Sequence, residues 1–149
     1  RAALPSGDIS RGDLLSVIPF GNTLVMREIT GERLLAALEH GVSEEGGQGP
    51  RLLHTAGLRY VVDAARPAGS RIVRAEILNE KDTGTPLDRK ARYVIVTIEY
   101  LARGGDAYEM LKDSKVIPSP EPIDITVVED YLKKHSPLPQ PEGERIIRQ

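Results

Sequence analysis

The sequence predicts an α+β fold in which a mixed β-sheet packs with helices. Segments rich in β-branched and aromatic residues occur at 23–29, 58–63, 71–78 and 93–98, which is typical of strands. Segments with apolar residues at helical spacing lie between and after them, at 31–41 and 124–134. Strands and helices do not alternate regularly, so the pattern favours α+β over a repeated β-α-β arrangement.

The first helix and strand have clear boundaries. Ser10 followed by Asp13 resembles a capping box, so a short helix begins there and ends before Pro19. Residues 19–22 are predicted to turn into the strand at 23–29. A second helix follows from Thr30, and Gly41 is its expected C-cap.

The second half of the chain is predicted to contain a hairpin, a strong strand and two helices. A Gly-rich loop at 43–50 leads to the strand 58–63, which pairs with 71–78 as a hairpin. The run at 93–98 is the strongest strand signal, and we expect it to be central in the sheet. After a tight loop at 103–106 come helices at 108–112 and 124–134, and a Pro-rich tail at 136–143.

Composition narrows the functional classes. The chain has 149 residues, enough for one domain, and a formal net charge of -2, which argues against binding a nucleic acid polymer or an anionic membrane. No segment approaches the ~20 apolar residues of a membrane span. Cysteine is absent, which excludes thiolate chemistry, and we expect the dispersed histidines to be structural or surface residues rather than metal ligands: His40, His54 and His135.

Two loops carry residue types suited to ligand binding. The first, at 19–23, holds the single Phe of the chain, Phe20, in a turn. The second, at 99–108, combines Tyr100 with paired glycines and Asp106, whose carboxylate could accept hydrogen bonds from vicinal hydroxyls. Together these groups would suit a nucleoside. The residues alone leave an alternative open, in which both rings are core residues and Asp106 caps the following helix.

Several spaced motifs along the chain resemble the C-terminal domain of the 5′-nucleotidase family. They are Gly7-Asp8-Ile9-Ser10, Pro19-Phe20-Gly21-Asn22, Thr30-Gly31, Leu38-Glu39-His40-Gly41, Ala56-Gly57-Leu58-Arg59-Tyr60, Arg66-Pro67-Ala68-Gly69-Ser70-Arg71, and Tyr100 with Gly104-Gly105-Asp106-Ala107-Tyr108. The resemblance covers nearly all of residues 1–149 and implies one domain of this kind. Family members usually carry an N-terminal metallophosphoesterase domain with a two-metal centre, and nothing in this chain resembles that domain.

The resemblance implies roles for individual residues. Phe20 and Tyr100 match the aromatic pair that sandwiches the nucleobase, although the second position is commonly Phe in the family. Asp106 matches the carboxylate that holds the ribose hydroxyls. Further substrate contacts are implied for Arg1, Asn22 and Gly49. Ala107 stands where the family usually has glycine.

These matches imply a nucleotide-binding domain of a hydrolase that is periplasmic, secreted or at the cell surface. The chain opens at Arg1 without a Met, so we expect a fragment or a processed product. The chain itself is expected to have no catalytic residues, metal ligands or cofactor, and to be inactive alone. Its partners would be a nucleoside or nucleotide and its own N-terminal domain, which would supply two divalent metal ions. Two alternatives remain: a family member with a non-nucleotide substrate, such as a sulfur-oxidation thiohydrolase, or a non-catalytic interaction module.

Overall fold

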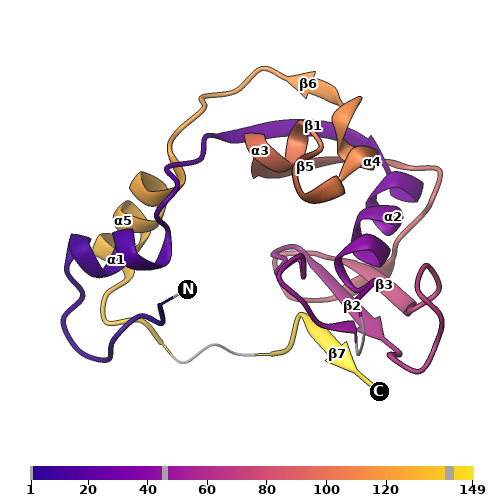
Figure 1. The fold of residues 1–149 in the computed structure, drawn as a ribbon, viewed down its shortest axis with the longest axis horizontal. Coiled ribbons are helices and arrows are strands. Elements are labelled where there is room, and N and C mark those ends of the chain that lie inside the picture. Colours follow the sequence, from indigo (N-terminus) through magenta and orange to yellow (C-terminus); the bar gives the residue numbers. More distant parts are fainter. Residues whose placement is uncertain (1, 45–46, 140–142) are drawn as a thin grey trace.

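The computed structural model describes residues 2–44, 47–139 and 143–149. Helix α1 (Arg11–Val17) packs against the last helix, α5 (Asp124–His135), on one side of the molecule. Two small sheets and the remaining helices form the other side (Figure 1). The predicted α+β class is confirmed, but the strands divide between two sheets, one antiparallel and one mixed.

The three-stranded sheet has β1 (Leu24–Thr30) at its centre, flanked by β5 (Arg92–Ile98) and β6 (Lys115–Ile117). Both neighbours run antiparallel to β1. The expectation that the 93–98 strand is central was therefore wrong, because β5 is an edge strand. Its Ile95 packs on the core, whereas Val94 and Val96 are 54% and 62% exposed, so the apolar run does not reflect burial on both faces.

The four-stranded sheet is built on the predicted hairpin. Strands β2 (Leu58–Val62) and β3 (Ile72–Leu78) pair antiparallel, and β4 (Gly84–Pro86) extends the sheet beyond β3. On the other side β7 (Ile146–Arg148) pairs parallel to β2. The end of the chain thus returns to the sheet after α5, a pairing that no local sequence pattern indicated.

Helix α2 (Gly31–Gly41) lies between the two sheets and contributes to both core clusters. Leu38 packs with Tyr60 and Val62, while Ala37 packs with Tyr108 and Leu111. The Thr30 hydroxyl caps the helix by accepting a hydrogen bond from the Arg33 N–H at 3.4 Å.

The end of α2 differs from the expectation. Gly41 is the last helical residue and Val42 is the C-cap, so the expectation that Gly41 caps the helix was wrong. Gly41 is buried, and a Cβ there would lie 3.1 Å from the Tyr108 hydroxyl and 3.2 Å from the Arg51 carbonyl oxygen. Close packing of the neighbouring loop explains the glycine better than helix termination does.

The first helix matches its sequence signal. Ser10 Oγ accepts from the Asp13 N–H, and the Asp13 carboxylate accepts from the Ser10 N–H at 2.8 Å, which completes the capping box. The Ser10 hydroxyl also donates to Asp13 Oδ2 at 2.6 Å, and this hydrogen bond, followed by that from the Ser10 N–H, lowers the pKa of Asp13. Helix α1 ends at Val17, before Pro19, and the chain then turns toward β1.

Candidate functional site

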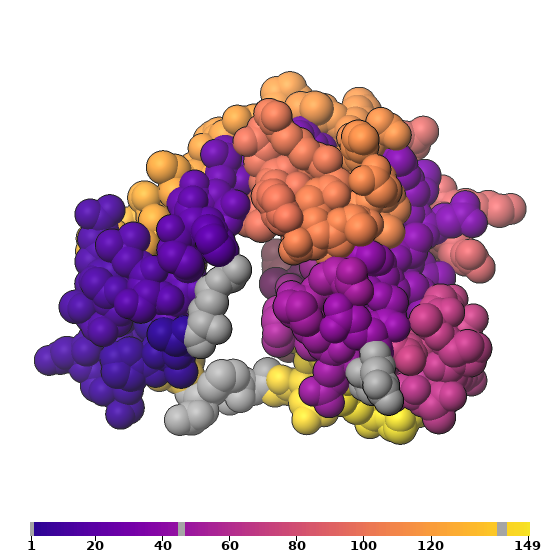
Figure 2. All heavy atoms as spheres, viewed as in Figure 1, coloured from indigo at the N-terminus to yellow at the C-terminus, as the bar shows by residue number. Residues whose placement is uncertain are grey.

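A cleft of about 530 Å³ opens where the segments before β1 and after β5 approach the 50–53 loop. Figure 2 shows open space at the centre of the molecule, between the indigo N-terminal segment and the residues of the two sheets. The lining combines apolar, aromatic and polar side chains from distant parts of the sequence: Phe20, Asn22, Pro50, Arg51, Leu52, Leu53, Ile98, Tyr100, Leu101, Asp106 and Tyr108. Four of the six residues that the sequence nominated therefore lie on one cleft.

The two aromatic residues, 80 positions apart in sequence, share this cleft without being buried. Phe20 is 64% exposed and Tyr100 is 50% exposed, so the alternative that both are core residues was wrong. Phe20 lies between α1 and β1, and Tyr100 lies in α3 (Glu99–Ala102), directly after β5. Exposed aromatic faces in a cleft are suited to stacking on a planar ligand.

Asp106 makes its side-chain contact with Tyr100. The Tyr100 hydroxyl donates to Asp106 Oδ1 at 2.9 Å and accepts from the Asp106 N–H at 3.2 Å. The following helix, α4 (Glu109–Lys112), has Tyr108 at its N-cap and no side-chain cap hydrogen bond. The alternative that Asp106 only caps this helix was therefore also wrong.

The backbone around Asp106 has an unusual conformation. Asp106 and Ala107 lie in the short 3₁₀ segment η2 (Gly105–Ala107) with φ angles of 51° and 65°, in the left-handed region that disfavours L-residues. His40 holds this loop from α2, because its Nε2 lies 2.8 Å from the Asp106 carbonyl oxygen. A carbonyl can only accept, so Nε2 of His40 carries the proton. The sequence analysis did not predict that His40 contacts the backbone of Asp106, a residue that lines the cleft.

Asn22 connects the cleft to α5. Its Nδ2 donates to Asp124 Oδ2 at 3.2 Å, and the Asp124 N–H donates to the Asn22 carbonyl at 2.8 Å. Asp124 is only 9% exposed, and its other carboxylate oxygen accepts from the Ile125 N–H at 2.7 Å. One of the two Nδ2 hydrogens of Asn22 is therefore engaged within the protein, which leaves the second hydrogen and Oδ1 as the groups that could contact a ligand.

The 50–53 loop is held against the cleft by two buried tyrosines. Tyr108 donates to the Arg51 carbonyl at 2.5 Å, and Tyr60 donates to the Leu53 carbonyl at 2.6 Å. Desolvation by burial raises the pKa of each hydroxyl to about 12. Both hydroxyls therefore stay protonated as donors at neutral pH. Of these two tyrosines, only Tyr108 lies within the loop at 99–108 that the sequence nominated, whereas Tyr60 lies in β2.

The two remaining nominated residues are not part of this lining. Gly49 has a φ of 153°, and a Cβ there would collide with the Glu44 carboxylate; its neighbour Pro50 lines the cleft instead. Arg1 lies outside the described residues. Arg51, which sequence reasoning did not nominate, contributes a cationic side chain and pairs with Glu44 at 2.9 Å.

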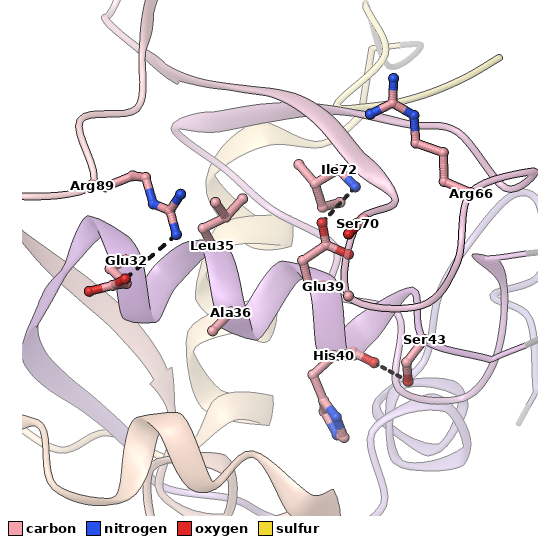
Figure 3. A pocket seen from close by; sticks show the side chains of 11 residues that line it. Glu32, Leu35, Ala36, Glu39, His40, Ser43, Arg66, Ser70, Ile72 and Arg89 are labelled. Atoms are coloured by element: carbon pink, nitrogen blue, oxygen red, sulfur yellow. Dashed lines mark hydrogen bonds and ion pairs between the residues drawn. The ribbon is translucent and has the colours of Figure 1, made fainter.

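A second groove, of about 640 Å³, lies over the outer side of α2 (Figure 3). Its charged groups are already paired: Glu32 with Arg89 at 3.5 Å, and Glu39 with the N–H groups of Arg71 and Ile72 at 2.9 and 2.8 Å. In Figure 3 Glu39 points toward Ile72, whereas His40 extends from the helix in the opposite direction. The Phe20–Tyr100 cleft, which presents exposed aromatic faces, is the better candidate for a ligand site.

The described part of the chain contains neither a candidate metal-binding cluster nor a helix that could cross a membrane. Among residues 2–44, 47–139 and 143–149, no group of three or more His, Cys, Asp or Glu side chains could hold a metal ion. His135 is engaged locally, since its Nδ1 lies 2.9 Å from the Tyr131 carbonyl oxygen and its ring stacks on that of Tyr131. No described helix has the length and apolar character that a membrane crossing requires.

Comparison with known proteins agrees with this architecture. The family model for the 5′-nucleotidase C-terminal domain matches residues 1–113. A snake venom 5′-nucleotidase from Crotalus adamanteus is 34% identical over 146 residues, which is 95% of this chain and 25% of that protein. The chain thus spans about a quarter of the length of that curated relative.

Solved structures show the same fold. The 5′-nucleotidase precursor from Thermus thermophilus is 40% identical and superposes with a TM-score of 0.92, over 99% of this chain and 29% of that one. A sulfate thiohydrolase from the same organism shares the fold at 24% identity, with a TM-score of 0.71 over 97% of this chain and 26% of that one. The family match covers well over half of the residues, so the chain belongs to the 5′-nucleotidase family and corresponds to its C-terminal domain.

Proposed function

We propose that this chain binds the nucleoside part of a nucleotide for a 5′-nucleotidase-like phosphohydrolase. Phe20 and Tyr100 would stack on the two faces of the base, and Asp106 would accept hydrogen bonds from the sugar. Asn22 would contribute a polar contact through its side-chain amide. The single observation that carries the proposal is that two exposed aromatic rings and a carboxylate, distant in sequence, line one cleft.

The size and chemistry of the cleft support this function. Its volume of about 530 Å³ lies within the usual ~300–1,000 Å³ of small-molecule sites. Stacking a base on an aromatic side chain contributes about 1–3 kcal/mol, and a hydrogen bond to a charged carboxylate contributes about 1.5–3 kcal/mol. Since stacking tolerates any base, the aromatic pair would provide affinity and the polar groups would orient the sugar.

Hydrolysis of the phosphate ester would belong to another part of the full-length protein. The family resemblance implies an N-terminal metallophosphoesterase domain with two divalent metal ions, and the described residues of this chain contain no cluster that fits them. In such an enzyme the nucleoside bound here would present its phosphate to the metal centre across the domain interface. The chain alone would therefore bind nucleosides without releasing phosphate.

The family relationships also support a location outside the cytoplasm. The Crotalus relative is a venom protein by its name, which favours a secreted, periplasmic or cell-surface protein here as well. The fold shared with a sulfate thiohydrolase keeps a non-nucleotide substrate as the second candidate. A non-catalytic interaction module is the third, and the retained cleft with Phe20, Tyr100 and Asp106 counts against it.

The test is equilibrium binding of adenosine and uridine to the chain and to its Asp106→Ala variant, measured by titration calorimetry. We expect at least tenfold weaker binding for the variant, because the charged acceptor is lost. Asp113→Ala is the matched control, since the Asp113 side chain is 85% exposed and lies 4.0 Å from Arg33 on another surface. Equal affinity of Asp106→Ala and the parent chain, or no binding by the parent chain, would contradict the proposal.

A separate assay tests the division of labour between this chain and the rest of the protein. The purified chain is incubated with AMP and Mn²⁺, Co²⁺ or Zn²⁺, and released phosphate is measured. We expect none, because the His, Asp and Glu side chains among the described residues do not form a cluster that could hold two metal ions. Metal-dependent release that persists through repeated purification would show that the chain itself holds the catalytic centre.

A further inference from the structure

The Tyr100 hydroxyl occupies a position that affects how Asp106 can hold a sugar. A hydroxyl has one hydrogen, and that of Tyr100 is directed to Asp106 Oδ1 at 2.9 Å. A lone pair on the same oxygen accepts from the Asp106 N–H at 3.2 Å. The hydroxyl therefore bridges the carboxylate and the backbone of one residue.

Both ends of this bridge are fixed by their surroundings. The Tyr100 ring lies against Gly105, where a Cβ would be only 2.5 Å from the ring carbons Cε1 and Cζ. The Asp106 backbone is held by His40 Nε2 at its carbonyl oxygen, at 2.8 Å. The His40 ring in turn packs edge-on against Tyr108, with centroids 4.7 Å apart. The ring and the backbone are thus positioned so that the Asp106 carboxylate can accept the hydrogen of the Tyr100 hydroxyl, and rotation of the carboxylate away from Tyr100 would break this hydrogen bond.

This arrangement leaves the two oxygens of the carboxylate unequal. In the part of the chain that the structure describes, Oδ1 accepts from Tyr100 and no hydrogen bond is made to Oδ2. A carboxylate holds two neighbouring hydroxyls most strongly when each donates to its own oxygen. Because Oδ1 already accepts from Tyr100, a sugar hydroxyl that donates to Oδ1 must share this oxygen with the Tyr100 hydroxyl, whereas one that donates to Oδ2 meets no competing donor among the described residues.

We propose that Tyr100 determines sugar specificity by competing with a sugar hydroxyl for Oδ1, so that Asp106 holds the sugar mainly through Oδ2. The site would then accept a nucleoside that lacks one of the two ring hydroxyls nearly as well as the ribonucleoside. Deoxyribonucleosides would belong to its substrate class. This inference rests on the proposed function, since it assumes that a nucleoside occupies the cleft with its sugar at Asp106.

The experiment compares three ligands that differ only at the sugar: adenosine, 2′-deoxyadenosine and 3′-deoxyadenosine. Their dissociation constants are measured with the parent chain and with Tyr100→Phe, which keeps the ring and removes the hydroxyl. For the parent chain we expect one deoxynucleoside to bind within about twofold of adenosine. For Tyr100→Phe we expect both to bind about tenfold more weakly than adenosine, or ~1.4 kcal/mol, because both carboxylate oxygens then take part.

The ratios between ligands isolate the effect from changes in the site as a whole. Removing the hydroxyl also loosens Asp106, but that change affects adenosine and its analogues alike and cancels in each ratio. Tyr131→Phe is the matched control, since it removes the hydroxyl of a 53% exposed tyrosine on α5 that does not line the cleft. Its ratios should equal those of the parent chain.

Two outcomes would overturn the inference, and they are distinguishable from failure of the proposed function. A parent chain that binds adenosine at least tenfold more tightly than both deoxynucleosides already uses both oxygens. Ratios that are unchanged in Tyr100→Phe give the hydroxyl no role in specificity. In both cases adenosine still binds and the proposed function stands, whereas absence of adenosine binding to the parent chain would overturn both.

Discussion

Gly105 and Tyr100 are in such close contact that a side chain at residue 105 would displace the aromatic ring. A Cβ built on Gly105 would lie 2.5 Å from Cε1 and Cζ of Tyr100, well inside van der Waals contact. The glycine therefore sets the position of one wall of the cleft. It also allows the Tyr100 hydroxyl to reach both the carboxylate and the N–H of Asp106.

The first prediction is that Gly105→Ala weakens nucleoside binding at least tenfold, because the Tyr100 ring must move away from its stacking position. Overpacking of this kind also lowers the free energy of unfolding by about 1–3 kcal/mol. Binding is measured by calorimetry and stability by urea denaturation. Gly12→Ala in α1 is the control, since a Cβ there has an ordinary contact of 3.5 Å with Ser10 Oγ. Tight binding by Gly105→Ala would show that the ring position is not critical.

The second prediction concerns Ala107, whose φ of 65° is costly for an L-residue. Ala107→Gly should raise the free energy of unfolding by about 0.5–1 kcal/mol, since relief of strain exceeds the entropy that glycine loses on folding. Urea denaturation measures the change. Ala68→Gly, in a turn without a positive φ at that residue, should instead be neutral or destabilising. Destabilisation by Ala107→Gly would mean that the methyl group makes a contact worth more than the strain.

The third prediction concerns Glu39, which links α2 to the start of β3. Its two carboxylate oxygens accept from the N–H groups of Arg71 and Ile72 at 2.9 and 2.8 Å. Glu39→Gln replaces one acceptor with a donor, so we expect a loss of about 1–3 kcal/mol in the free energy of unfolding. Glu32→Gln on the same helix removes only an exposed ion pair with Arg89 and should cost less than about 1 kcal/mol. Equal effects of the two variants would contradict this role of Glu39.

Much of the local structure followed from local sequence signals. The capping box at Ser10 and Asp13, the helix after Thr30 and the 58–78 hairpin all depend on residues near one another in the chain. The features that were missed depend on distant packing. The central strand is β1, which pairs with both β5 and β6, whereas β5 pairs, among the described strands, with β1 alone and lies at the edge. Strand β7 joins its sheet only because the tail returns to β2.

The site shows the same division between local and distant information. The residues alone left Phe20 and Tyr100 as either core or ligand-binding residues and Asp106 as either a helix cap or a ligand-binding residue, and the family resemblance favoured the ligand interpretation. Their exposure and shared cleft were settled by the tertiary structure. The contact of His40 with Asp106 joins residues 66 positions apart, and that of Asn22 with Asp124 joins residues 102 apart, so no local motif could indicate them.

The fourth prediction is a loss of stability in alkaline solution caused by Tyr60 and Tyr108. Burial raises the pKa of each hydroxyl from 10.0 to about 12, so the folded chain keeps these protons where the unfolded chain loses them. A pKa raised by folding gives stability that is complete below the unfolded value and is lost as pH rises through the folded value. The free energy of unfolding should therefore fall between about pH 10 and pH 12.

Urea denaturation from pH 8 to pH 11.5 measures this decline, and Tyr60→Phe assigns part of it. At pH 8 the variant should be less stable by about 0.5–1.5 kcal/mol, because the hydrogen bond to the Leu53 carbonyl is lost. Above pH 10 its stability should fall less steeply than that of the parent chain, since one ionising group is gone while every lysine is kept. Parallel curves for the two proteins would contradict the assignment, because the alkaline loss would then come from groups other than Tyr60.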